Sequence, residues 1–186
     1  SYLSNLAEDF NHRCAYCNTL DKHMNQSYPI DHFIPQEALK GTDMEKLIHD
    51  YNNLMYCCPK CNNTKSSQYK GDIHDGSYNN DLFYNPVDTD YNEIFYRNEY
   101  GGISSEDMKG KDMIINLKLF SPIYNFSFLI EEVTEVLNKI NDKIEKTTDQ
   151  SEKEYYNFQK KNKIKKVFTK KVIIYDSTIS INDLKV

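Results

Sequence analysis

Residues 14–61 open with Cys14-Ala15-Tyr16-Cys17 and close with Cys58-Pro59-Lys60-Cys61, two C-x-x-C pairs separated by 40 residues. One such pair presents two thiolates from a tight turn, and two pairs complete the tetrahedral sulfur shell that zinc prefers. The sequence therefore predicts a structural Zn²⁺ site, and a redox-active thiol switch is the alternative. The expected ligands are Cys14, Cys17, Cys58 and Cys61, whereas Cys57 is expected to point away from Cys58 and to pack.

The cysteines also indicate a compartment. All five fall within these two groups and none occurs elsewhere, whereas disulfide-stabilised secreted domains spread their cysteines along the chain. This pattern favours a reducing environment, so we expect a cytoplasmic protein. The apolar runs are too short to span a bilayer, so we expect no membrane association.

Hydrophobic spacing predicts an α+β module around the two pairs. A metal site would strengthen this small core, because metal binding energy becomes folding energy. The predicted elements are a short helix over residues 2–10, a strand within 27–35, a short helix over 42–50, a strand over 54–56 and a helix opening after Pro59.

The residues between the pairs suit phosphodiester hydrolysis. Such a reaction needs a base near neutral pH to activate water, and we assign this role to His32. It also needs positive charge near the phosphate and the leaving oxygen, which a hard cation with oxygen ligands supplies. Asp31 and the amide oxygen of Asn62 are the expected ligands of a catalytic Mg²⁺ or Mn²⁺ ion.

Residues 12–66 resemble the HNH endonuclease family in the order of their motifs. A C-x-x-C pair is followed by Asp31-His32 with Pro35, then by Asn53-Leu54, then by the second C-x-x-C pair with Asn62 and Lys65. Asn62 stands where many members have a second His, which is a known variant with the pattern His-Asn-Asn. The resemblance implies a zinc-braced ββα-metal, treble-clef-like module that cleaves DNA, with duplex DNA expected. It gives Asn53 a role in bracing the loop that orients His32.

Two basic residues are expected to contact the phosphate backbone, namely Arg13 and Lys65. Taken singly, each candidate has a simpler structural reading; their joint order around two C-x-x-C pairs favours catalysis. Two alternatives stay open. One is a non-catalytic zinc module that binds nucleic acid or protein, and the other is a nuclease that acts on RNA.

A narrower resemblance rests on further motifs. The C-A-Y-C start, the D-H-F-I-P block, the Y-x-N-L-x-x-C-C-x-x-C-N run and the later Phe83-Tyr84-Asn85-Pro86 resemble the HNH component of Septu-type and related retron antiphage systems. That resemblance implies a role in defence and an ABC-type ATPase as partner.

The remainder of the chain reads as a largely helical accessory region. We expect the nuclease module at residues 1–70 and the accessory region at 71–186. The accessory region should contain a hairpin around residues 93–103, a long amphipathic helix over 126–144 and a last strand over 172–175, with no internal repeat.

Charge is distributed unevenly over these parts. Residues 1–70 have a net charge of −1, residues 71–150 of −9 and residues 151–186 of +5, within a total of −5. Residues 151–171 hold eight lysines among aromatic residues. The lysines and aromatic rings of this stretch could bind a nucleic acid through phosphates and bases, or they could form a solvated helix face. The sequence favours neither interpretation.

Overall fold

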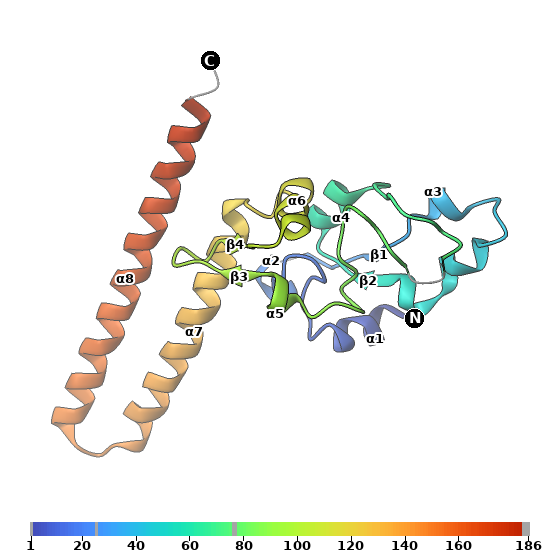
Figure 1. Ribbon diagram of the computed structural model, residues 1–186. Helices are drawn as coiled ribbons and strands as arrows, with labels where there is room; N and C mark the ends of the chain where they lie inside the picture. The colour runs from blue at the N-terminus through green and yellow to red at the C-terminus, as the bar shows by residue number, and fades with distance from the viewer. Residues whose placement is uncertain (1, 25, 76–77, 184–186) are drawn as a thin grey trace. The chain divides into compact units, whose positions relative to one another are not determined.

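The computed structural model describes residues 2–24, 26–75 and 78–183 (Figure 1). The chain forms two compact units. The first comprises Ser1–Asn98 and Ile103–Ser121, and the second comprises Glu99–Gly102 and Pro122–Val186.

The first unit opens with helix α1 (Tyr2–Asp9), which buries Leu6 and Ala7. A loop containing the first cysteine pair follows, closed by an isolated antiparallel bridge between Arg13 and Leu20. Short helix α2 (Asp21–Met24) leads out of this loop. The predicted N-terminal helix is confirmed, because its apolar residues share one face.

A two-stranded antiparallel sheet forms the centre of this unit. Strand β1 (Ile30–His32) pairs with β2 (Leu54–Tyr56), so that His32 faces Leu54 and Asp31 faces Met55. Helix α3 (Gln36–Leu39) and the 3₁₀ segments η1 (Glu45–His49) and η2 (Tyr51–Asn53) connect the strands. The second strand has the predicted bounds, whereas the first is shorter than the predicted 27–35.

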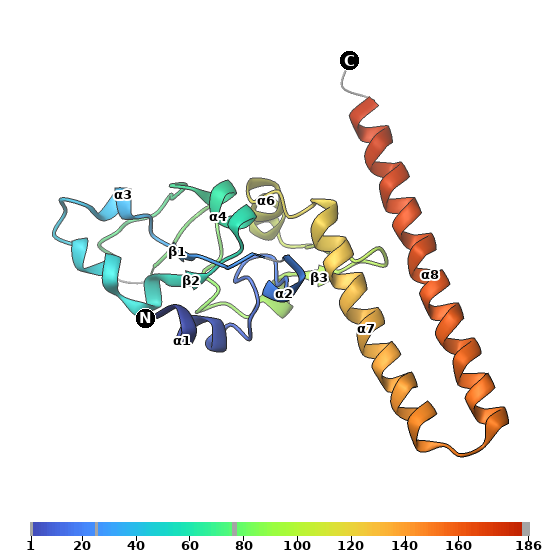
Figure 2. The same ribbon diagram turned by 180° about the vertical axis from the view of Figure 1, so that it is seen from behind.

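Helix α4 (Pro59–Lys65) follows the sheet directly. Pro59 stands in its first turn, where a missing N–H costs nothing. The order strand, strand, helix is the predicted one, and the two figures show α4 beside the β1–β2 sheet (Figure 1, Figure 2). The core beneath contains fully buried Tyr28, Phe33 and Met55.

The rest of the first unit consists of short elements. These are α5 (Tyr91–Ile94), the hairpin β3 (Tyr96–Arg97) with β4 (Ile103–Ser104), and α6 (Met108–Asn116). The predicted hairpin is confirmed, although its first strand begins only at Tyr96, since Glu93 belongs to α5. Asp107 caps α6 by accepting a hydrogen bond from the backbone N–H of Gly110 at 2.7 Å.

The second unit is dominated by two long helices, α7 (Pro122–Lys146) and α8 (Gln150–Asp183), which run side by side in both views (Figure 2). The predicted amphipathic helix is confirmed as α7. The predicted last strand over 172–175 is wrong, because this segment lies within α8. Its β-branched residues favour a strand locally, but no Gly or Pro after residue 147 interrupts the helix. Within the described parts of the chain, no helix combines the length and the apolar character needed to cross a membrane.

Candidate active site and metal centre

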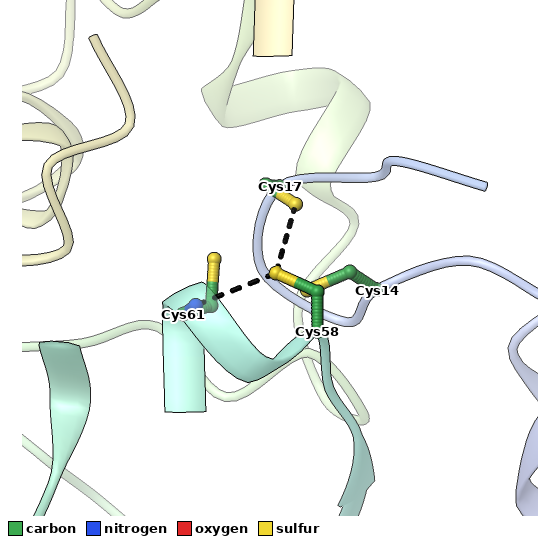
Figure 3. A group of neighbouring side chains, drawn as sticks. All are labelled: Cys14, Cys17, Cys58 and Cys61. Carbon is green, nitrogen blue, oxygen red and sulfur yellow. Dashed lines mark hydrogen bonds between the residues drawn. The ribbon is translucent and has the colours of Figure 1, made fainter. Parts of the chain in front are cut away.

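The four predicted zinc ligands form one buried cluster (Figure 3). Their sulfur atoms all lie within 4.8 Å of one another, and the sulfurs of Cys17 and Cys58 are 3.8 Å apart. A tetrahedron with Zn–S bonds of about 2.3 Å has S–S edges of roughly 3.8 Å. The cluster therefore fits a zinc ion in both donor type and spacing, and these four cysteines could bind structural zinc.

Backbone geometry brings the two pairs together. The first pair lies on a tight loop in which Asn18 adopts a positive φ of 58° and its N–H donates to the carbonyl of Cys14 at 2.9 Å. The second pair starts α4, where the N–H of Cys61 approaches the sulfur of Cys58 at 3.4 Å. The N–H of Ala15 donates to the carbonyl of Tyr56 in β2 at 2.8 Å, and so ties the loop to the sheet.

A residue from the later hairpin also holds this loop. The guanidinium of Arg97 in β3 donates from Nη2 to the carbonyl of Cys17 at 2.9 Å. Cys57 is buried beside the cluster and lies outside the group of four, with its sulfur 3.4 Å from the carbonyl of Cys58. This placement agrees with its predicted packing role.

A polar cleft of about 360 Å³ lies beside β1 and α4. Three of the predicted catalytic or metal-binding side chains, Asp31, His32 and Asn62, line it together. The strand supplies the first two and the helix the third, as the motif order predicts. The other lining residues are Ile30, Pro35, Gln36, Glu37, Asn63, Ser66 and Ser67.

The hydrogen bonds of His32 define its tautomer. Its Nε2 lies 3.0 Å from the carbonyl oxygen of Ile48, which can only accept, so Nε2 carries the proton. Nδ1 is then the basic nitrogen, and the amide nitrogen of Gln36 lies 3.3 Å from each of the two ring nitrogens. Burial lowers the pKa of His32, and this effect outweighs the Ile48 carbonyl and Asp31, which raise it. His32 is therefore a neutral base near pH 7, as a general base must be.

Asn53 is fully buried and binds two backbone segments at once. Its Oδ1 accepts from the N–H of Ile34 at 2.7 Å, and its Nδ2 donates to the carbonyls of Ile34 and Leu47 at 3.1 and 3.0 Å. Ile34 follows His32 in the chain, and Leu47 precedes the Ile48 carbonyl that orients the imidazole. The contacts of Asn53 thus fix the backbone near His32 and the backbone near the Ile48 carbonyl, which orients the imidazole.

Asp31 and Lys65 form a buried ion pair. The Lys65 ammonium is fully buried and lies 3.3 and 3.2 Å from the two carboxylate oxygens of Asp31, which is 5% exposed. It also donates to the carbonyl of His32 at 2.7 Å. The hydroxyl of Tyr16 donates to the same carboxylate at 2.7 Å. Burial raises the pKa of Asp31, while Lys65 and Tyr16 act in the opposite direction.

The two predicted phosphate contacts differ in their placement, and only Lys65 is closed off from solvent. Lys65 directs its charge at Asp31 inside the protein and has no exposed surface. Arg13 is half-buried on the cysteine loop, where its Nη1 donates to the carbonyl of Asn18 at 3.0 Å. The cleft is built by other residues of the described chain.

Three groups that contact His32 or Asp31 were not predicted from the sequence. The Ile48 carbonyl gives no signal in a sequence, because any residue carries one. Tyr16 stands inside the first C-x-x-C pair, where packing is the simpler interpretation. Gln36 follows His32 by four residues across Pro35, and a polar side chain opening a short helix there was the available signal.

Comparison with known proteins gives a family for the segment that contains both centres. No curated protein and no solved structure matches the chain. Residues 14–68 match the family model described as HNH endonuclease, which supports that family for the part of the chain that builds the cysteine cluster and the cleft and suggests a nuclease.

Proposed function

We propose that this protein is a metal-dependent endonuclease that hydrolyses phosphodiester bonds of DNA, with duplex DNA as its first substrate. One observation carries the proposal. His32, a neutral imidazole whose Nδ1 is the basic nitrogen, lines the same polar cleft as Asp31 and Asn62, within the segment that matches HNH endonuclease.

In this mechanism His32 accepts a proton from the attacking water through Nδ1. The Ile48 carbonyl holds the imidazole by Nε2 and stabilises the positive charge that forms, because it keeps accepting a hydrogen bond from the protonated ring. Asn53 keeps the two backbone segments in register during this step. The cleft is polar and open, so water and a phosphate group can enter it.

Asp31 and Asn62 would hold the divalent cation. Both line the cleft and carry side-chain oxygen atoms, the donor type that Mg²⁺ and Mn²⁺ require. A carboxylate has about four lone-pair sites. Lys65 and Tyr16 occupy three positions on Asp31, so the carboxylate keeps capacity for a cation. When bound, Mg²⁺ or Mn²⁺ supplies positive charge for the phosphate and for the leaving 3′ oxygen.

The basic residues take different parts in the proposal. Lys65 neutralises Asp31 inside the protein and so maintains a buried carboxylate at the floor of the site. Arg13 stays the proposed phosphate contact, supported by a partly exposed side chain whose guanidinium suits phosphate oxygens. The cluster of four cysteines is proposed to hold zinc in a treble-clef-like arrangement.

The test is cleavage of plasmid DNA by the purified chain with added Mg²⁺ or Mn²⁺, beside His32→Ala. The matched control is His74→Ala, which removes a half-exposed imidazole that lies outside the cleft lining. We expect nicking or linearisation by the wild type and by His74→Ala, and none by His32→Ala. Zinc content is measured for all three proteins, so that a misfolded variant is recognised.

Equal cleavage by the wild type and His32→Ala would overturn the assignment of His32. Inactivity on plasmid, together with cleavage of a structured RNA, would shift the substrate class to RNA. Binding of either nucleic acid without cleavage would favour a non-catalytic zinc module.

We also propose a cytoplasmic role in antiphage defence with an ABC-type ATPase as partner. Support comes from the Phe83-Tyr84-Asn85-Pro86 motif after the nuclease segment and from cysteines that are all free of disulfides. Phage plating on cells with the wild type or His32→Ala, each with and without the ATPase, tests this. Equal plating on all four strains would contradict it.

A further inference from the structure

The outward face of α8 is the strongest surface feature of the second unit. One side of the helix packs on α7: the ammonium of Lys160 donates to the Asn141 side chain at 2.9 Å, and that of Lys143 lies 5.6 Å from the centre of the Tyr156 ring. Lys163 and Val167 line the groove between the two helices. These α8 residues recur at helical spacing, so they define the side that faces α7.

Residues on the other side form what we call the outer stripe of α8, namely Tyr155, Phe158, Lys161, Asn162 and Lys165. All five are exposed, and Tyr155 and Phe158 expose 58% and 61% of their surfaces. The Tyr155 ring contacts the edge of its neighbour Tyr156, at 5.6 Å between ring centroids, and most of the surface of both Tyr155 and Phe158 stays in water. The outer stripe therefore presents aromatic rings and ammonium groups to solvent within about three helical turns.

The charge of this segment is not neutralised by its own helix. Residues 155–167 contain five lysines and no Asp or Glu. Glu132 and Glu135 of α7 line the groove together with Lys163 and Lys166, whereas Lys161 and Lys165 are not among its lining residues. Lys161 and Lys165 therefore keep their charge free for a partner.

We infer that the outer stripe of α8 binds a nucleic-acid strand, with Lys161 and Lys165 on the phosphates and Phe158 and Tyr155 stacking on unpaired bases. Lysines attract the phosphate backbone through release of counterions, and aromatic faces stack on bases of any sequence. A second copy of the chain fits less well, because a symmetric contact would place these lysines against their own counterparts. This inference deepens the proposed function by adding a second nucleic-acid site, one that takes an unpaired strand beside the proposed duplex substrate, and it rests on that function for the identity of the ligand.

The test is binding of fluorescein-labelled 20-nucleotide single-stranded DNA and of the matching duplex to the full chain carrying His32→Ala, without added divalent metal and over a series of salt concentrations. The charge variant is Lys161→Gln/Lys165→Gln. Its matched control is Lys139→Gln/Lys146→Gln, which removes two exposed lysines from α7. The stacking variant is Phe158→Ala, and its control is Ile130→Ala, which is 53% exposed on α7.

For single-stranded DNA we expect the charge variant to reduce the slope of log K against log salt by about 1.4, or about 0.7 for each lost phosphate contact. We expect Phe158→Ala to weaken single-strand binding about tenfold or more and to leave duplex binding unchanged. Both controls should bind as the parent does. Far-UV circular dichroism confirms that each variant keeps its helices.

An equal loss of DNA affinity in the control variants and in the stripe variants would overturn the inference. So would failure of the parent to bind either DNA at low salt, and so would a concentration-dependent dimer that the stripe variants abolish. Because binding is measured in His32→Ala, the result does not depend on cleavage. Intact binding beside an inactive wild type would count against the proposed nuclease and leave the outer stripe standing.

Discussion

Replacing Lys65 by Met should destabilise the first unit strongly. The substitution keeps the length of the side chain and removes an ammonium that is fully buried against Asp31 and also binds the carbonyl of His32. The carboxylate then stays buried with the Tyr16 hydroxyl as its remaining side-chain donor from the ion-pair network. Breaking a buried pair on one side costs about 3–5 kcal/mol, because an uncompensated charge is left behind. The free energy of unfolding of a native protein is about 5–15 kcal/mol in total, so the expected loss is a large share of it.

The same loss can be expressed as a shift in melting temperature. For a chain of this size, each kcal/mol lowers Tm by about 2–4 °C, so Lys65→Met should lower it by roughly 6–20 °C. Urea denaturation followed by near-UV circular dichroism of the tyrosines gives the free energy of unfolding. The double variant Asp31→Asn/Lys65→Met should recover part of the loss, because it removes both charges, and the cycle should show a coupling of about 2 kcal/mol or more.

The outcome separates two roles for Lys65. A solvated lysine that only contacts phosphate would change the free energy of unfolding by less than about 0.5 kcal/mol when replaced. It would lower the affinity for DNA instead. A small change in the free energy of unfolding, together with the absence of coupling to Asp31→Asn, would refute the role of Lys65 as the buried counter-ion of Asp31.

Three further predictions concern the same unit. Asn53→Ala should lower the free energy of unfolding by at least about 2 kcal/mol, because it leaves buried backbone groups unpaired; urea denaturation measures this, and an unchanged midpoint would contradict it. Because the pKa of His32 lies below its ordinary value of 6.5, the midpoint of the acidic decline in kcat/KM should lie below pH 6.5; a decline centred above pH 6.5 would argue against His32 as the base. Cys58→Ser should lose bound zinc and the cooperative unfolding of this unit, whereas Cys57→Ser should keep its zinc; metal analysis by mass spectrometry decides this, and loss of zinc from both variants would place Cys57 among the ligands.

Much of the site was predictable because the residues of each motif lie close together in the sequence. The two C-x-x-C pairs predicted the cluster of four sulfurs, and the short apolar run Leu54–Tyr56 predicted β2. Pro59 predicted the start of α4. These features depend on local geometry, which neighbouring residues decide.

The parts that were missed depend on residues far apart in the chain. Lys65 lies 34 residues from Asp31, and nothing near either residue indicates that they form a pair. The prediction of a last strand was wrong for a related reason. Val172 and its neighbours have strand propensity, but they continue a helix that starts at Gln150. Local preference is a weak guide where a long uninterrupted helix is the alternative.

The position of the two cysteine pairs has a consequence for how the cleft assembles. Both strands of the small sheet, and with them Asp31 and His32, lie between Cys17 and Cys58. A zinc ion bound at the cluster would close this loop, and loop closure costs conformational entropy that the metal–sulfur bonds would have to offset. His32, Asp31 and the start of α4 would then be ordered or lost together. A newly made chain that found no zinc would lack the whole cleft, so metal supply would decide how many molecules in a population are competent.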